Sequence, residues 1–214
     1  MDQEFLKPLS MEGYKCGFVG RVEGVEVDTD RDATIARLEP FHREAVGNLG
    51  FEWSNFWRAE QVHGAEVAVV DSKEGALIGG VDGLVTNVRG VAVGIYVADC
   101  GAIYLLDKKH NAIGLLHSGK KGTELEILGE ALRKMKEVYG TDPGDVIGVL
   151  APCIRPPAYD VDFACQIRMN AERLGIVEFH DCGICTSSDL GRYYSYRVER
   201  GATGRMLAIF GIEA

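Results

Sequence analysis

The sequence lacks the features that would place a protein in a membrane or on nucleic acid. No window approaches about 18 consecutive apolar residues, so we expect no transmembrane helix. No basic segment followed by an apolar run opens the chain, so we expect no signal peptide and a cytoplasmic location. Acidic residues outnumber basic ones, 32 to 23 in 214 residues. The resulting net charge of −9 argues against a general nucleic-acid binder, which needs a basic face.

Metal-binding cysteine pairs and repeats are also scarce. The six cysteines lie in a long chain without a secretory signal, which favours reduced thiols. Cys182 and Cys185 form a lone C-x-x-C with no second copy, so we interpret them as packing residues. Because neither a repeat nor a low-complexity linker interrupts the chain, we expect a single domain over residues 1–214.

Local patterns predict a mixture of helices and strands. Helices are expected over 31–47, 123–139 and 162–174, with Asp30 or Asp32 capping the first and Gly140 ending the second. Pro40 is a candidate break in the first helix. Strands are expected as a hairpin over 13–28, at 64–70, 91–98, 102–106, 112–116 and 145–154, and as two strands within 191–212.

The stretch "VADCGAIYLLDKKHNAIGLLHSG" (97–119) contains one cysteine and one histidine at the ends of two apolar runs. The polar segment "DKKHN" suits a hairpin turn. If Asp107 pairs with Asn111, Gly101 faces His117, and a slip of one residue keeps Cys100 within diagonal reach of His117. The alternative is that Cys100 only packs in the core, since an isolated cysteine at the end of a strand is usually a buried packing residue.

A second histidine strengthens the hypothesis of a site. His63, in "EQVHGAEV", comes just before another expected strand. Two histidines and one cysteine are a ligand set compatible with catalytic zinc, with a fourth position open. The other histidines, His42, His110 and His180, are interpreted as solvated surface residues.

Several motifs in register resemble the laccase-domain family, also described as YfiH-like, polyphenol oxidase or purine nucleoside phosphorylase. They are "QVHG" (61–64), "DGLVT" (82–86), "ADC" (98–100), "HSGKKG" (117–122), "PCI" (152–154), "CT" (185–186), "YSYR" (194–197) and "TGR" (203–205). The resemblance implies an α+β fold in which mixed β-sheets are sandwiched between helices. It also implies that His63, Cys100 and His117 are the metal ligands and that Arg21 matches the family's early arginine.

The sequence departs from the family at two places. Lys120 and Lys121 follow "HSG" where the family usually has Trp-Arg, and "VEVDTDRDAT" replaces the family's "SLNL" stretch. A lysine acts as a point charge and does not reproduce the bidentate hydrogen bonds of arginine. The expected metal site is therefore intact, whereas the substrate contacts differ.

The resemblance implies an enzyme that cleaves adenosine- and inosine-type nucleosides with phosphate and deaminates adenosine, with zinc favoured over copper. A multicopper cluster needs more histidines than the five present. Asp99 and Arg21 are the candidate catalytic residues. The candidate substrate-binding residues are Gln61, Lys121, Tyr159, Ser195 and Arg197. The expected partners are a purine nucleoside and phosphate, with no nucleic acid or membrane, and the oligomeric state is open.

Three other readings stay open. Cys100 and His117 without metal could form a Cys-His hydrolase, such as an amidase that edits a peptidoglycan precursor. A His₂Cys set could instead hold one copper ion in a polyphenol oxidase. A non-catalytic protein could use the same pocket for binding alone.

Overall fold

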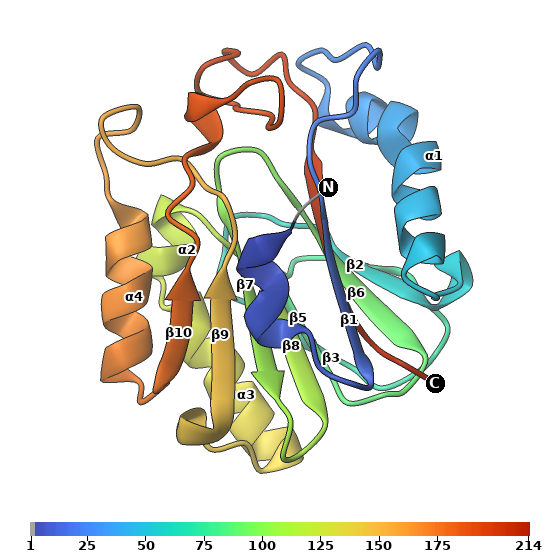
Figure 1. Ribbon diagram of the computed structural model, residues 1–214, viewed down its shortest axis with the longest axis vertical. Coiled ribbons are helices and arrows are strands. Elements are labelled where there is room, and N and C mark those ends of the chain that lie inside the picture. Colours follow the sequence, from blue (N-terminus) through green and yellow to red (C-terminus); the bar gives the residue numbers. More distant parts are fainter. Residues whose placement is uncertain (1–2) are drawn as a thin grey trace.

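The computed structural model describes residues 3–214, which form two mixed β-sheets packed face to face between helices (Figure 1). The central strands of each sheet are covered by helices on one face and by the other sheet on the opposite face. Because both faces are buried, these strands have continuous apolar runs. Tyr104 and Leu106 point into the core between the sheets, whereas Ile103 and Leu105 contact the helices on the outer face. This layered arrangement confirms the expected α+β fold.

The first sheet has five strands in the order β1-β11-β6-β2-β4. Its strands are β1 (Tyr14–Val19), β11 (Met206–Ile212), β6 (Val91–Val97), β2 (Phe56–Ala59) and β4 (Leu77–Ile78). β11 pairs antiparallel with both β1 and β6, whereas β2 runs parallel to β6 and β4. The sheet therefore joins the two ends of the chain.

The second sheet has six strands in the order β10-β9-β7-β8-β5-β3. Its strands are β10 (Glu178–Asp181), β9 (Val146–Leu150), β7 (Gly101–Asp107), β8 (Ala112–Ser118), β5 (Gly83–Thr86) and β3 (Val67–Val70). The outer pairs β10/β9 and β5/β3 are parallel, and the pairs between them are antiparallel. The hairpin β7-β8 lies at the centre of this sheet.

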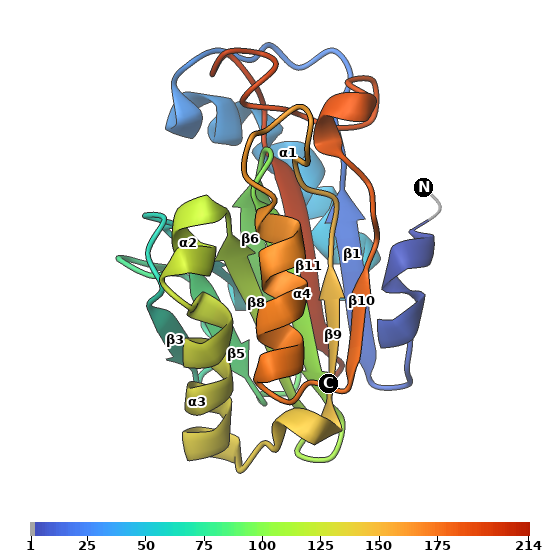
Figure 2. The ribbon, with the colours of Figure 1, turned by 90° about the vertical axis from the view of Figure 1, so that its left-hand side faces the viewer.

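Helices cover the outer face of each sheet. α1 (Arg31–Asn48) packs through Val46 on the five-stranded sheet, with Asp30 capping its first turn through the N–H groups of Asp32 and Ala33. Figure 2 shows α3 (Ile127–Tyr139) and α4 (Phe163–Arg173) in front of the six-stranded sheet, with the short α2 (Lys120–Glu124) above α3. No helix within residues 3–214 is long and apolar enough to cross a membrane.

The connecting segments include four 3-10 helices. They are Glu4–Leu9, Trp53–Asn55, Pro143–Asp145 and Thr186–Ser188. In Figure 1, the segments that follow β1 and precede β11 lie at the same end of the molecule as the β6-β7 connection. That connection carries Cys100, so these distant segments gather around the expected site.

Several local predictions need correction. The hairpin expected over 13–28 is wrong, because only β1 forms there and it pairs with β11. The first strand expected within 191–212 is also wrong, since turns occupy that segment before β11. β10 was not predicted. In each case a long-range pairing decides the structure, and short alternating segments do not specify it.

The helix predictions were close but differ in detail. α1 continues through Pro40, whose side chain is exposed. The predicted helix over 123–139 is divided, because Glu126 adopts a left-handed backbone (φ 64°) between α2 and α3. Gly140 ends α3 in the left-handed conformation, as predicted. His42, interpreted as solvated, is instead fully buried under α1.

Candidate active site

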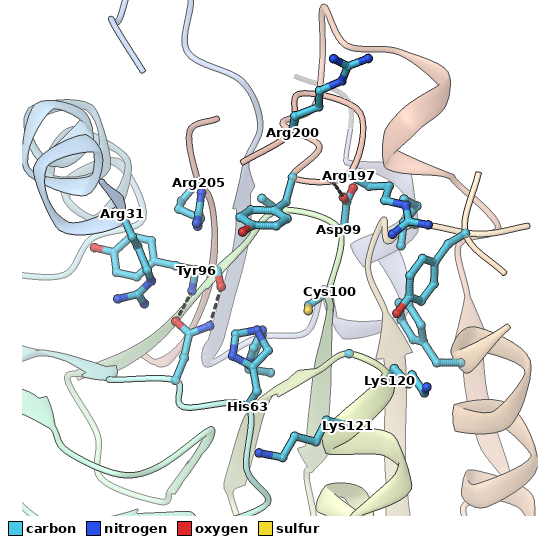
Figure 3. A pocket seen from close by; sticks show the side chains of 18 residues that line it. Arg31, His63, Tyr96, Asp99, Cys100, Lys120, Lys121, Arg197, Arg200 and Arg205 are labelled. Carbon is cyan, nitrogen blue, oxygen red and sulfur yellow. Dashed lines mark hydrogen bonds between the residues drawn. The ribbon is translucent and has the colours of Figure 1, made fainter. Parts of the chain in front are cut away.

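The fold brings the two histidines and the cysteine together. Cys100 immediately precedes β7, His117 lies near the end of β8, and His63 lies in the loop after β2. The β7-β8 register pairs His117 with Ala102, one residue away from the predicted Gly101, because Asp107 pairs with Ala112. Despite this slip, the ligand atoms of the three residues lie within 4.8 Å of one another. Figure 3 shows His63 close to Cys100 at the wall of a cavity.

One buried carboxylate, Asp82, orients both histidines. Asp82 precedes β5 and is fully buried, and its Oδ1 lies 2.8 Å from Nδ1 of His117. The backbone N–H groups of Val62, His63 and Gly64 also donate to this carboxylate, at 2.7–3.1 Å. Since an ionised carboxylate only accepts hydrogen bonds, Nδ1 of His117 carries the hydrogen and Nε2 is free for a ligand.

Two hydrogen bonds between the side chain of Gln61 and the backbone of β6 hold the loop that carries His63. The amide of Gln61 donates to the carbonyl of Tyr96 at 2.5 Å and accepts from its N–H at 2.9 Å. Gln61 and His63 both have positive φ, at 67° and 59°. These strained conformations persist because Asp82 and Tyr96 fix the turn on both sides.

The electrostatics of the cluster favour a metal-binding thiolate. Burial opposes ionisation of Cys100, but the charges and hydrogen bonds of His117 and His63 outweigh it and lower the pKa of the thiol. Burial likewise opposes protonation of His117, but Cys100 and Asp82 raise the pKa of its imidazole. The pair therefore favours a thiolate beside an imidazole whose other nitrogen is already fixed.

The cluster borders a cavity of about 740 Å³, within the range of small-molecule sites. Six cationic side chains line it, from Arg31, Lys120, Lys121, Arg197, Arg200 and Arg205. Asp99 is the one carboxylate on the wall within residues 3–214. Tyr96, Tyr159, Phe163 and Tyr196 supply aromatic surface. A cavity of this charge suits an anion together with a planar group.

Most of the predicted substrate-binding residues line the cavity, whereas one of them is buried behind its wall. Gln61, Lys121, Tyr159 and Arg197 line the cavity, and the guanidinium of Arg197 lies 5.4 Å from the ring centre of Tyr159. Ser195 is buried, and its hydroxyl accepts from the N–H of Val198. Ser195 is not among the lining residues.

The two candidate catalytic residues have different positions. Asp99, with a φ of 84°, is buried on the wall, and its oxygens accept from the Thr186 hydroxyl and the Arg197 N–H, each at 2.7 Å. Arg21 lies behind the wall, pairs with Glu199 at 2.6 Å and stacks on Tyr194. Arg21 thus contacts the segment that carries Arg197 without lining the cavity.

Sequence reasoning missed Asp82, Arg31, Arg200 and Arg205. Asp82 was available in the "DGLVT" motif, where a carboxylate directly before a buried strand was a usable signal. Arg200 and Arg205 lie close together in the sequence, and Arg205 belongs to the "TGR" motif, whereas Arg31 is distant and no local pattern places it beside them. Cys182 and Cys185, by contrast, are free thiols, and the backbone of Cys185 forms an isolated parallel β-bridge with that of Cys153.

Comparisons with known proteins identify the family of the chain. The profile of the family described as multi-copper polyphenol oxidoreductase laccase matches residues 25–171 and 160–213. A purine nucleoside phosphorylase of Deinococcus radiodurans is 31% identical over 219 residues, covering 90% of this chain and 84% of its own. The purine nucleoside phosphorylase YlmD of Bacillus subtilis is 25% identical, covering 86% and 79%.

A solved structure shares the whole architecture. The crystal structure of YlmD from Geobacillus stearothermophilus superposes with a TM-score of 0.83 at 25% identity, covering 95% of this chain and 93% of that one. The family profile alone spans most of the sequence. The chain therefore belongs to the laccase-domain family, whose members include the YlmD and YfiH proteins.

Proposed function

We propose that the chain is a zinc-dependent purine nucleoside enzyme, which cleaves adenosine- and inosine-type nucleosides with phosphate and also deaminates adenosine. The observation that carries this proposal is the cluster of His63, Cys100 and His117 at a cation-lined cavity. The names of the Deinococcus and Bacillus relatives support the phosphorolytic class. Deamination rests on the family resemblance and on the donor set.

The chemistry of the donor set fits zinc. A thiolate and two imidazoles are N and S ligands of the types that zinc binds, and three protein ligands leave the fourth position open, as in catalytic zinc sites. When bound, zinc would supply Lewis-acid activation of a water or phosphate oxygen. His63, Cys100 and His117 would hold it, and Asp82 fixes the tautomer of His117. The remaining histidines, His42, His110 and His180, do not line the cavity, so the residues do not support a multicopper cluster.

In phosphorolysis, an oxygen of phosphate bonds to C1′ of the ribose while the bond from C1′ to the purine nitrogen breaks. Lys121 and Arg197 border the cavity as cations that attract phosphate. Tyr159, packed edge-on against Phe163, presents an aromatic surface to the base. In deamination, water adds at C6 of adenine and ammonia leaves.

Asp99 is proposed as the group that exchanges a proton with the substrate. Its hydrogen bonds to Thr186 and Arg197 hold the carboxylate beside Cys100. Arg21 and Ser195 act through Glu199, because its carboxylate accepts hydrogen bonds from the Arg21 guanidinium and from the Ser195 N–H. We therefore propose that these two residues position the segment carrying Arg197 and do not contact the substrate.

The test combines metal analysis with a substrate panel. Purified protein should contain near-stoichiometric zinc and release hypoxanthine from inosine only with phosphate, and inosine and ammonia from adenosine in water. His63→Ala should lose the zinc and both activities, whereas His180→Ala, at an exposed surface position, should keep them. Zinc-replete protein that releases neither base nor ammonia would contradict the proposal.

The closeness of Cys100 to His117 also favours one alternative, a metal-independent Cys-His hydrolase. The amidase reading predicts a protein that keeps activity after dialysis against a chelator and whose Cys100 is alkylated rapidly. Zinc that protects Cys100 from alkylation, with activity lost on chelation, rules out this alternative.

A further inference from the structure

The charge of the cavity exceeds what a neutral nucleoside and one phosphate require. Six cationic side chains line the wall, in a protein of net charge −9. The one carboxylate on the described wall, Asp99, is engaged by two hydrogen bonds. Three of them pair with carboxylates at the rim, Arg31 with Asp32, Lys120 with Glu124 and Arg197 with Asp160. A phosphate carries about two negative charges at neutral pH, so a single phosphate does not match all the cations of the wall.

Four of the six cations lie on opposite sides of the metal-ligand cluster. Figure 3 shows Arg31 and Arg205 on one side of His63 and Cys100, and Lys120 and Arg197 on the other. Arg31 is the first residue of α1, and Arg205 immediately precedes β11. Burial, and then the charge of Arg31, lowers the pKa of Arg205, whereas Tyr196, Cys100 and Asp99 act in the opposite direction.

Neither guanidinium of this pair is neutralised by a buried carboxylate. Nη1 of Arg205 donates to the carbonyls of Thr203 and Gly204, and within residues 3–214 no carboxylate lies within ion-pairing distance of it. Arg31 donates to the carbonyl of Glu60, and its carboxylate partner within residues 3–214 is Asp32, whose side chain is 89% exposed. Carbonyl oxygens orient the two groups without removing their charge, and an anion between them would relieve the repulsion.

Building on the proposed function, we propose that Arg31 and Arg205 bind a phosphate ester carried by the substrate, so that the substrates are purine nucleoside monophosphates. The inorganic phosphate then binds on the opposite side, at Arg197. As its oxygen bonds to C1′, the bond to the purine breaks, the base leaves with a proton, and the sugar product carries two phosphates. No oxidant or further reactant is needed.

The experiment compares adenosine, adenosine 5′-monophosphate and adenosine 3′-monophosphate with the zinc-replete protein and phosphate, following adenine release. We expect kcat/KM for one monophosphate to exceed that for adenosine by roughly 10- to 100-fold, the range for a charge-assisted hydrogen bond. Arg31→Gln should reduce this preference by at least about tenfold. Arg31→Lys should restore part of it, since the charge returns without the planar fork.

The matched control is Arg37→Gln, on the same helix but outside the cavity, which should leave the preference unchanged. Equal kcat/KM for adenosine and both monophosphates overturns this inference while leaving the proposed function intact. The same follows if Arg31→Gln lowers the rates for adenosine and the monophosphates by one common factor. Adenine release from none of the three substrates overturns the proposed function and this inference together.

Discussion

Asp82 connects three parts of the site through a single carboxylate. It accepts from three consecutive N–H groups of the His63 loop and from the imidazole of His117. Burial opposes its ionisation, but the hydrogen bond from His117 and those from Gly64 and His63 hold the pKa of the carboxyl below its usual range. Asp82 therefore stays ionised and fixes two of the three metal ligands at once.

Asp82→Asn should weaken zinc binding by roughly 10- to 100-fold, the range observed for partners of metal-bound histidines. The amide cannot accept all four hydrogen bonds, because its NH₂ group is a donor. Competition with a chromophoric chelator measures the affinity. Asp71→Asn, at an exposed position, is the control. Unchanged zinc affinity in Asp82→Asn would show that the histidines are oriented without this carboxylate.

Asp99 combines a structural and a proposed chemical role. Asp99→Asn keeps one acceptor oxygen, so one of the contacts to Thr186 and Arg197 is lost. We expect kcat/KM for phosphorolysis to fall by roughly 10- to 100-fold. If Asp99 exchanges a proton, the pH–rate profile should also lose one limb. A profile of unchanged shape at reduced rate would assign Asp99 to positioning only.

At the scale of elements, the turn from β8 into α2 determines how closely helix and ligands approach. Gly119, between His117 and Lys120, lies against Cys100, and a Cβ built on it would be 2.5 Å from the Cys100 sulfur. The sulfur is a metal ligand candidate inside a packed site, so it has little room to move. Glycine is therefore required at this position because the Cys100 side chain lies so close, and not because the backbone adopts a left-handed conformation.

Gly119→Ala should displace either Cys100 or the first turn of α2, lowering zinc affinity by at least about tenfold. The control is Gly47→Ala in α1, where nothing lies within 4 Å of the added carbon. That control should retain zinc and keep or slightly raise stability, because alanine favours helix over glycine. Full zinc affinity in Gly119→Ala would show that the β8-α2 turn tolerates more movement than its packing indicates.

Local signals predicted elements where the interaction is itself local. The cap of α1 by Asp30 and the end of α3 at Gly140 depend on neighbouring residues, and both predictions are confirmed. The buried side of α1 does not follow from apolar residue type: Thr34, Leu38, His42 and Val46 are buried, whereas the apolar Phe41 is 43% exposed. The sheet beneath the helix decides which side faces inward, and residue periodicity alone leaves that choice open.

For the whole molecule, the layer between α1 and the five-stranded sheet contains an ionisable group. His42 is fully buried beside Tyr96, at 5.4 Å between ring centres. The Arg205 backbone approaches the ring, but neither ring nitrogen reaches hydrogen-bond geometry with a protein group. Burial lowers the pKa of His42 to about 4, from the ordinary value of 6.5.

Acid should therefore destabilise the fold through His42. Its folded pKa lies below its unfolded pKa, so the stability it contributes is complete above pH 6.5 and is lost as the pH falls toward 4. The loss amounts to up to about 3 kcal/mol. Urea unfolding between these pH values measures it. His42→Gln should show a shallower decline than wild type, whereas the exposed His180→Gln should not; parallel curves for wild type and His42→Gln would contradict this account.

The amino-acid sequence by itself determined the short-range parts of this protein: the β7-β8 hairpin that joins Cys100 to His117, the cap of α1, and a ligand set whose chemistry suits zinc. These depend on neighbouring residues and on side-chain type. Only the tertiary structure decided that β1 pairs with β11, that Asp82 reaches both histidines, and that Arg31 and Arg205 meet at the cavity. Such contacts join distant segments through burial and packing of two sheets, which periodicity in one sequence does not encode.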